Sequence, residues 1–430
     1  MLPDGWRRTT LGNIGSIKSG STPARSQHDR YFVNGKWPWV KTMDLTNSVI
    51  LKTDELITDA ALNESSCKIF PAGTVLVAMY GGLKQIGRTG LLQEESAVNQ
   101  AISAIDVERN QAHPEFILHW LNGNVEAWKN FAASSRKDPN ITRENVCDFP
   151  VILPTLGEQR RIVHILSTWD QAIATTERFL ANGRMQWNAL IGLTLHLPSA
   201  NRDASAPAEN SGFPASVQPG IPTLPPAPPG WRRIQLRDHL KEVRRPVALV
   251  NDETYTLVTV KRSRGGVELR EVLQGNEVKT PTQFYVHADD FLISKRQIVH
   301  GACGIVPPAL DGAVVSNEYA VLNTDGEIDL RFLRYLSESR YFQQTCFHSS
   351  IGVHVEKMIF KTDHWLNWPF NIPPLAQQEY IVGILDTASR EIASISEQLK
   401  ALKREKSALM AQLLTGKRRV HLPADEAASA

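Results

Sequence analysis

The feature that most limits how this chain can fold is a pattern of apolar residues that occurs twice. Over residues 162–194 the seam positions recur in alternating steps of four and three, which is typical of a helix packed along a partner helix. The same register describes residues 381–413, 219 positions further along the chain (381 − 162). A long helix with so narrow an apolar stripe cannot bury that stripe alone. We therefore predict two long helices, each the partner of the other.

The two helices should pack antiparallel and span roughly 50 Å, at about 1.5 Å per residue over about 33 residues. The apolar members of the two seams are the residues expected at the contact. These helix-packing residues are Ile162, Leu166, Trp169, Ile173, Leu180 and Leu190 in the first helix, and Ile381, Leu385, Ile392, Ile395, Leu399 and Leu409 in the second.

The segments around the helices repeat as well. Gly-Trp-Arg-Arg begins at Gly5 and again at Gly230, and a proline-containing segment precedes each helix, at 149–154 and 368–374. Proline suits a helix start because its missing N–H would have no helical partner there. These two Gly-Trp-Arg-Arg openers lie 225 positions apart (230 − 5), whereas the helices lie 219 apart. The segment between opener and helix is therefore about six residues longer in the first half than in the second (225 − 219). Repeats with unequal inserts indicate duplication followed by divergence.

Between opener and helix, each half has the pattern of a mixed α/β domain. Residues 74–80 form an apolar, β-branched run typical of a buried strand, and residues 291–294 occupy the matching place. A glycine-containing turn follows each strand, and short helices are expected at 114–132 and 330–346. We therefore expect an α+β protein, with two similar lobes of one fold joined by two long helices packed as an antiparallel coiled coil.

Composition marks a different segment between the halves. Residues 201–229 are dense in Pro, Ala, Ser and Gly and hold few large apolar side chains, so they should form a linker. The resulting division is a first lobe at 1–153, a first helix at 154–197, a linker at 198–229, a second lobe at 230–372, a second helix at 373–416 and a tail at 417–430.

Composition also bounds the class of protein. The 430 residues are 42% hydrophobic and 21% charged, as expected for soluble globular domains. No run of about 18 apolar residues occurs, and the N-terminal segment lacks the apolar centre of a secretory signal. The four cysteines stand singly, which argues against a disulfide framework or metal cluster and fits a reducing cytoplasm. With a net charge of only +2, nucleic-acid binding would depend on local patches.

A search for catalytic motifs finds no complete one. Residues 82–89 match a phosphate-binding loop except that Arg88 replaces the lysine, and no helix pattern follows. Asn371 begins an Asn-Ile-Pro-Pro sequence like that of amino-methyltransferases, without a glycine-rich cofactor motif beside it. The 12 histidines include no His-x-x-x-His pair with a carboxylate between them. We expect no catalytic, cofactor-binding or metal-binding residues in this chain.

Basic side chains gather in turns at corresponding places in the two halves. Turns with glycines after a buried strand can approach a partner closely, so these side chains are candidates for DNA contact. The candidates are Lys41, Lys84, Arg88, Arg136 and Lys137 in the first half, and Lys261, Arg262, Arg264, Lys295, Arg296 and His300 in the second. The alternative is that some of them pair with Glu94, Glu95 or Asp311 and only solvate the lobe.

Taken in order, the motifs resemble the specificity subunit of type I restriction–modification systems. Each motif is weak alone, but their order, twice over, is specific, and the resemblance covers nearly the whole chain apart from the linker and tail. The features that carry it are Leu2-Pro3-x-Gly5-Trp6 with Leu11, the run Phe-Pro-Ala-Gly-Thr-Val-Leu at 70–76, the segment 154–166, Pro374-Leu375 with Gln378 and Ile384-Leu385-Asp386, and Leu-Leu-Thr-Gly-Lys-Arg at 413–418.

The resemblance implies that each lobe reads one half of a split, asymmetric site in double-stranded DNA. The helices would set the spacing and dock two modification subunits, which supply S-adenosylmethionine-dependent adenine methylation. Motor-nuclease restriction subunits would add cleavage driven by ATP with Mg²⁺. This chain would bind none of these cofactors and would lie in the cytoplasm, away from membranes. The proline-rich linker looks longer than the family usually shows.

Two other classes of function compete with this one. The first is a coiled-coil adaptor whose lobes bind proteins, and the second is a lone enzyme such as a nuclease. Basic and hydrogen-bonding residues at matching places on both lobes favour DNA over a protein partner. The incomplete motifs disfavour the enzyme.

Overall fold

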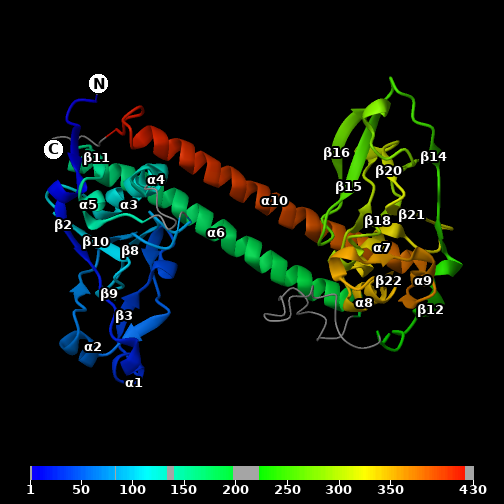
Figure 1. Ribbon diagram of the computed structural model, residues 1–430, viewed down its shortest axis with the longest axis horizontal. Helices are drawn as coiled ribbons and strands as arrows, with labels where there is room; N and C mark the ends of the chain where they lie inside the picture. Colours follow the sequence, from blue (N-terminus) through cyan, green and yellow to red (C-terminus); the bar gives the residue numbers. More distant parts are fainter. Residues whose placement is uncertain (1, 83, 133–139, 197–221, 422–430) are drawn as a thin grey trace. The chain divides into compact units, whose positions relative to one another are not determined.

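The structure of the protein is a computed structural model that describes residues 2–82, 84–132, 140–196 and 222–421. It divides into two compact units, each of which is considered by itself (Figure 1). The first comprises Met1–Glu177 and Glu397–Ala430, and the second Arg178–Ser396. This division differs from the one expected from the sequence because each long helix is shared between the units. The predicted domain boundaries therefore stay predictions, and most of the predicted linker, 197–221, lies outside the described residues.

The first unit is built on a short ribbon and two sheets. In the ribbon, β1 (Arg7–Thr10) pairs antiparallel with β11 (Pro150–Leu153). The first sheet has the order β2 (Gly15–Ser19), β10 (Ile102–Val107), β7 (Val75–Ala78), β8 (Thr89–Leu92), β4 (Ser48–Ile50). The second has the order β5 (Glu55–Ile57), β3 (Trp37–Val40), β9 (Ser96–Val98), β6 (Ile69–Phe70). The ribbon leads directly into the first long helix.

Short helices cover the first unit's sheets. They are α1 (His28–Tyr31), α2 (Asp59–Glu64), α3 (Pro114–Gly123), α4 (Val125–Ala132) and α5 (Arg143–Cys147). The single helix expected at 114–132 is two helices, because the chain leaves helical geometry at Asn124 (φ −122°, ψ 27°), whose side chain instead donates to the Trp120 carbonyl. Phe116 and Leu121 of α3 pack with Val75 and Val77 of β7 in one core.

The second unit repeats this plan. Its ribbon joins β12 (Arg232–Gln235) to β24 (Pro369–Ile372). One sheet has the order β13 (Leu240–Glu242), β21 (Tyr319–Thr324), β18 (Phe291–Ser294), β19 (Cys303–Ile305). The other has the order β14 (Pro246–Val247), β17 (Gln283–Tyr285), β20 (Val314–Ser316), β15 (Thr254–Val260), β16 (Val267–Gln274). The remaining elements are α7 (Leu330–Leu336), α8 (Arg340–His348), the hairpin β22 (Ser350–Ile351) and β23 (Ile359–Phe360), and α9 (Thr362–Trp365).

The two lobes share one strand topology. The order β2-β10-β7-β8 corresponds to β13-β21-β18-β19, and all neighbours in both are antiparallel. In the other sheet, β5-β3-β9-β6 corresponds to β16-β15-β20-β17, and the one parallel pair, β3 with β9, matches the pair β15 with β20. Each lobe adds one strand of its own, β4 in the first and β14 in the second. The expectation of two lobes with one fold is confirmed.

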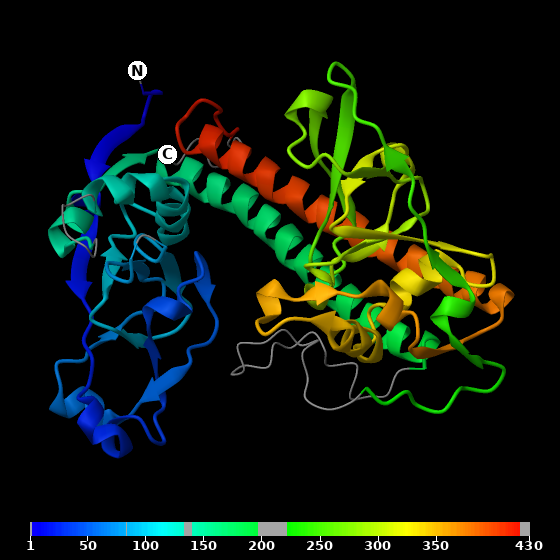
Figure 2. The same cartoon turned by 45° about the vertical axis from the view of Figure 1, so that its right-hand side comes forward.

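The long helices α6 (Leu156–Thr194) and α10 (Leu375–Leu413) pack antiparallel in each unit. In the first unit Lys406 of α10 pairs with Asp170 of α6 at 2.5 Å, and Lys403 pairs with Glu177 at 2.7 Å. In the second unit the ends of both helices, through Ile191 and Leu385, enter one core. Their ribbons run side by side in both views (Figure 1, Figure 2). The predicted helix pair is confirmed.

Glycine ends the second helix region, as the sequence indicated. Gly416 follows α10 with φ +71°, a conformation that L side chains rarely adopt. A Cβ there would also lie 2.6 Å from Cγ of Pro3. Beyond this turn, Arg419 pairs with the buried carboxylate of Glu158 at 2.8 Å, and Trp6 Nε1 donates to the same carboxylate at 3.1 Å. The opener, the start of α6 and the tail therefore meet at one buried side chain.

Candidate nucleic-acid interface

Two loops meet at one end of the second lobe. The first is the turn between β15 and β16, at 261–266, and the second is the loop between β18 and β19, at 295–302. The Ser263 N–H donates to the His300 carbonyl at 2.7 Å, and the Arg264 N–H donates to the Gly301 carbonyl at 2.8 Å. Ser263, Arg264 and Gly301 all have positive φ, which the tight approach of the two loops requires. The six basic candidates of the second half are thus brought together.

Each of these six side chains has a carboxylate partner. The pairs are Lys261 with Glu268 at 3.2 Å, Arg262 with Glu356 at 3.1 Å, Arg264 with Glu338 at 3.3 Å, Lys295 with Glu242 at 3.1 Å, Arg296 with Glu318 at 3.0 Å, and His300 with Glu356 at 3.1 Å. The alternative suggested by the sequence named Glu94, Glu95 and Asp311 as partners, and among the described residues none of these three pairs with the six side chains. Asp311 instead pairs with His287 at 3.1 Å. Except for Glu268, which lies seven residues from Lys261 (268 − 261), the partners lie on segments further away in the sequence, which a local pattern does not indicate.

Burial divides the six side chains into two groups. The side chains of Arg264, Lys295 and His300 are largely buried, whereas those of Lys261, Arg262 and Arg296 are about half exposed. Burial lowers the pKa of His300, and the nearby Glu356 carboxylate acts in the opposite direction. The hydrogen bond to Glu318 raises the pKa of Arg296. The side chains of the exposed group can move to meet an incoming ligand, whereas those of the buried group are held in place by the loops.

The first lobe brings the equivalent two loops together. Its loops are 41–47, which follows β3, and 79–88, which joins β7 to β8. Gln85 Nε2 donates to Met43 Sδ at 3.2 Å, and the Asn47 N–H donates to the Thr89 carbonyl at 2.9 Å. Lys84 is exposed and Arg88 is half-buried, and neither has an ion-pair partner in the part of the chain that the structure describes.

Arg136 and Lys137, the remaining candidates of the first half apart from Lys41, lie outside the described residues. They fall between α4 and α5, the interval in which the second lobe has the β22–β23 hairpin between α8 and α9. Their role in DNA contact stays a prediction.

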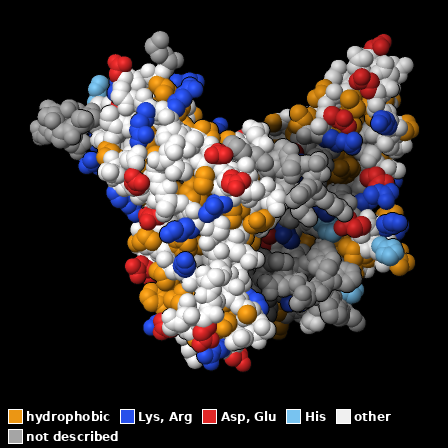
Figure 3. All heavy atoms as spheres, turned by 60° about the vertical axis from the view of Figure 1, so that its left-hand side comes forward, with side chains coloured by type: hydrophobic (Ala, Val, Ile, Leu, Met, Phe, Trp, Pro, Cys, Tyr) orange, Lys and Arg blue, Asp and Glu red, His pale blue; other side chains and the backbone are white. Residues whose placement is uncertain are grey.

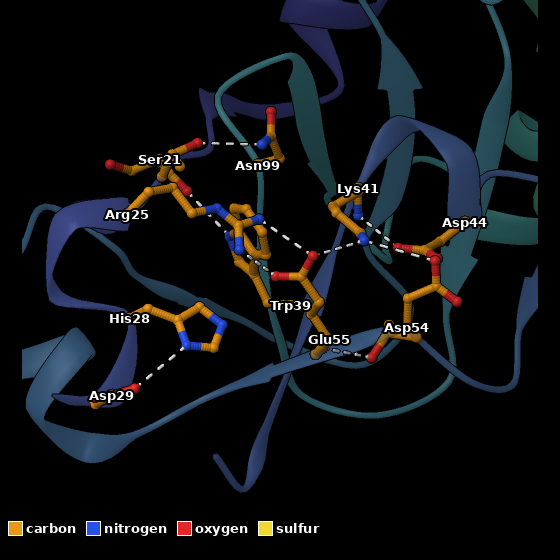
Figure 4. Close-up of polar contacts among 12 residues, drawn as sticks. Ser21, Arg25, His28, Asp29, Trp39, Lys41, Asp44, Asp54, Glu55 and Asn99 are labelled. Atoms are coloured by element: carbon orange, nitrogen blue, oxygen red, sulfur yellow. Dashed lines mark hydrogen bonds and ion pairs between the residues drawn. The ribbon is translucent and has the colours of Figure 1, made fainter. Parts of the chain in front are cut away.

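Lys41 belongs to a polar cluster within the first lobe (Figure 4). Its ammonium points toward Glu55 at 2.9 Å and Asp54 at 3.6 Å, and the hydrogen bond to Glu55 raises its pKa. Arg25 Nη1 binds the other oxygen of Glu55 at 2.7 Å, with its guanidinium 4.4 Å from the centre of the Phe32 ring. The Lys41 side chain is about three-quarters buried. Lys41 therefore fixes the start of the loop 41–47 to the lobe, while Lys84 and Arg88 lie on the loop 79–88.

Sequence reasoning missed Arg25 and the β22–β23 hairpin. The hairpin brings Glu356 to Arg262 and His300, and its turn exposes Val353 almost completely, at 95%. The only sequence signal was the short stretch Ile351-Gly352-Val353, in which Gly352 has φ +155°. Figure 3 shows acidic and basic side chains interspersed over the face turned to the viewer. The mixture of both charges on that face agrees with a net charge of only +2.

The predicted helix-packing residues are all buried or half-buried in the structure. Leu166 and Leu385 are completely buried, each within the core of its own unit. Burial varies along the seam: Leu180 and Leu399 are buried, whereas Ile173 and Ile392 are half-buried. The lobes complete the burial at the two ends, where their cores include the seam residues.

The motifs considered for catalysis have structural roles. Residues 82–89 lead into β8 rather than into a helix, as expected for a turn. Asn371 lies in β24, where its side chain donates to the Pro225 carbonyl at 2.9 Å. Among the described residues, no group of three or more His, Cys, Asp or Glu side chains could hold a metal ion. No helix of the described chain is long and apolar enough to cross a membrane.

Comparison with known proteins agrees with this architecture. Residues 3–181 match the family of the type I restriction modification DNA specificity domain. The chain is 25% identical, over 166 residues, to the specificity subunit of the type I restriction enzyme EcoR124I/EcoR124II from Escherichia coli, a match that covers 37% of this chain and 40% of that protein. The MjaIX specificity subunit from Methanocaldococcus jannaschii is 25% identical over 182 residues, which are 41% of this chain and 40% of that protein. The matched part thus spans about 40% of these curated relatives.

Over its full length the chain resembles a solved structure. The S subunit of a type I restriction–modification system from M. genitalium has a TM-score of 0.58 and 13% sequence identity, and the likeness covers 96% of this chain and 98% of that one. At this identity the likeness shows the fold. The fold of two lobes on a helix pair is therefore similar to that of a type I restriction–modification S subunit. The match of residues 3–181 to the DNA specificity domain family agrees with the resemblance inferred from the sequence.

Proposed function

We propose that this chain is the DNA sequence-specificity subunit of a type I restriction–modification complex, in which each lobe reads one half of a bipartite, asymmetric site. The observation that carries the proposal is the matched pair of loops. Both lobes bring the loop after β3 or β15 against the loop after β7 or β18, and both place basic side chains there. A protein built to read a split DNA site needs one reading surface on each of two similar bodies.

The helix pair suits a spacer that also docks partners. We propose that α6 and α10 set the distance between the half-sites and hold two modification subunits, with motor-nuclease restriction subunits joining the complex. S-adenosylmethionine, ATP and Mg²⁺ would then bind to those partners, and the chain itself would be non-catalytic and cytoplasmic. An adaptor with protein-binding lobes is less well supported, because it gives no reason for matched basic loops on both lobes.

The decisive experiment measures methylation with the candidate modification subunit. DNA from cells that express both proteins should carry methyladenine at one asymmetric motif with two separated halves. Replacing residues 1–153 with the corresponding lobe of a relative should change one half of that motif and leave the other unchanged. Methylation that does not depend on this chain, or a single uninterrupted motif, would contradict the proposal. Protein partners that bind the lobes without any effect on DNA would favour the adaptor.

A further inference from the structure

Three separate segments of the second lobe meet at the carboxylate of Glu356. The residue lies in the short turn Val355–Lys357, between the strands of the β22–β23 hairpin. Its Oε2 lies 3.1 Å from Nη2 of Arg262, and its Oε1 lies 3.1 Å from Nε2 of His300. Arg262 comes from the turn after β15, and His300 from the loop after β18. One anion is therefore shared by the two loops proposed to face DNA.

The two nitrogen donors converge in a way that suits a phosphate. The Arg262 guanidinium donates a charge-assisted hydrogen bond to one oxygen of the anion, and the buried Nε2 of His300 lies 3.1 Å from the other oxygen without forming a hydrogen bond, so two nitrogens face separate oxygens of one anion. The imidazole is largely buried, so its position is fixed, whereas 54% of the Arg262 side chain is exposed. The Ser263 and Arg264 backbone hydrogen bonds to the second loop hold the donors at this separation. The donor pair is therefore organised before any ligand arrives.

The carboxylate itself is only loosely held. The Glu356 side chain is 63% exposed, and an ion pair at such a site contributes little to stability because water competes for both charges. Glu55 of the first lobe provides the contrast (Figure 4). It also bridges two cations, Arg25 and Lys41, but its side chain is only 29% exposed, and Arg25 is fixed against the rings of Phe32 and Trp39. Glu55 is built into its lobe, and Glu356 is free to leave.

We propose that Arg262 and His300 form a binding site for a backbone phosphate of DNA, and that Glu356 occupies this site in the free protein as an internal competitor. The inference rests on the proposed function and assigns one contact within it. DNA of any sequence must displace the carboxylate before its phosphate can bind. The contact therefore weakens binding to non-cognate DNA, where few other contacts offset the displacement, and it is overcome where a half-site supplies base contacts.

The test is the affinity of the full chain for a non-cognate duplex, measured over a salt series. Glu356→Gln removes the competing charge and should tighten binding about two- to tenfold at low salt, with the gain shrinking as salt rises. The matched control is Glu327→Gln. Glu327 forms a similarly exposed ion pair with Arg232 at 3.2 Å, and 57% of the Glu327 side chain is exposed. Glu327 lies after the C-terminal end of β21. Glu327→Gln changes the net charge as much as Glu356→Gln does, but it should alter the affinity for DNA much less.

A double substitution separates a specific site from a general effect of charge. In an Arg262→Ala background the site has lost its principal donor, so adding Glu356→Gln should yield no more than the gain of Glu327→Gln. A full gain in that background, or equal gains from the two glutamate variants, would overturn the phosphate site. A Glu356→Gln chain that binds DNA no more tightly than the unsubstituted chain would also overturn the phosphate site. If the unsubstituted chain binds no duplex even with the modification subunit present, the proposed function fails and this inference with it.

Discussion

Gln159 and Gln378 occupy the same place in the two copies of the repeat, and both are completely buried. Gln159 donates to the Pro154 carbonyl at 3.0 Å and accepts the His113 N–H at 2.8 Å, which ties the start of α6 to the start of α3. Gln378 does the same with Pro373 and Asp329, at 2.9 and 2.8 Å. This repeated glutamine, near the start of each long helix, therefore attaches each lobe to its long helix.

Substituting this glutamine should destabilise the chain. Gln159→Ala leaves a buried N–H and a buried carbonyl without partners, and each such group costs about 1–3 kcal/mol. We expect a lower free energy of unfolding in urea, and an equal loss for Gln378→Ala. Gln377→Ala, at an exposed position one residue earlier, is the control. Equal stability of Gln159→Ala and the unsubstituted chain would show that the attachment is made elsewhere.

Arg296 and Lys84 should affect DNA binding differently. An arginine can bind a guanine edge with two hydrogen bonds, so Arg296→Ala should reduce discrimination in one half of the site by about tenfold. Lys84 is exposed, and a lysine more often neutralises phosphate. Lys84→Ala should therefore weaken binding to all sequences and flatten its salt dependence. The measurement is binding to cognate and half-site-scrambled duplexes over a salt series, with the partner subunit present. Unchanged affinity and specificity in both variants would place the DNA face elsewhere on the lobes.

His119 should make the first unit sensitive to acid. Burial, with help from the nearby ammonium of Lys406, lowers its pKa to about 4. In the unfolded chain the pKa of the imidazole is about 6.5, so the group binds a proton more readily there than in the folded protein. Protonation therefore favours unfolding. The stability gained from neutral His119 is complete above about pH 6.5 and is lost as the pH falls toward 4, by up to about 3 kcal/mol.

The check is the free energy of unfolding as a function of pH for the unsubstituted chain and for His119→Phe. The variant should lose less stability between pH 6.5 and 4, because it has no proton to gain on unfolding. His164→Phe, at an exposed position on α6, should follow the unsubstituted chain. Parallel curves for the His119 variant and the unsubstituted chain would refute this account.

At the scale of elements, the first long helix holds a glycine that its packing does not require. A Cβ added to Gly183 would meet only Cγ1 of Ile392, at 3.4 Å, which is an ordinary contact. Because glycine disfavours helix relative to alanine, Gly183→Ala should stabilise the chain by up to about 1 kcal/mol. Gly87→Ala is the opposite case, since its Cβ would lie 2.5 Å from the Trp128 ring. Chemical denaturation of both variants measures these effects, and a destabilised Gly183→Ala would mean that the helix contact is closer than described.

Periodicity and repetition were sufficient to predict the elements. The helices at 162–194 and 381–413 lie inside α6 and α10, and residues 291–294 coincide with β18, because apolar spacing reports directly which face is buried. The site was less predictable. The loops that hold Lys84 and Lys295 were found, but the carboxylates that pair with the six basic side chains of the second half come from strands, connecting segments and the hairpin. Pairing between distant segments depends on the folded topology, which a local pattern does not contain.

At the scale of the whole molecule, the proposed role predicts a chain without activity of its own. The purified protein should turn over neither S-adenosylmethionine nor ATP and should not cleave DNA, because its motifs are incomplete. Methylation should appear when the modification subunit is added. The measurement is transfer of a labelled methyl group to duplex DNA by each protein alone and by the mixture. Turnover by the isolated chain that persists through further purification would be the contrary result.

The approach of Pro3 to Gly416 has a consequence for the order of the halves. Because the opener and the tail beyond Gly416 meet at Glu158, a short peptide could join these two segments and close the backbone into a ring. Cutting that ring between 197 and 221 would give a chain that begins with the second lobe and ends with the first helix. Surface termini that lie near each other commonly tolerate such rearrangement. The second lobe would then precede the first in the sequence, while each segment kept the same neighbours in space.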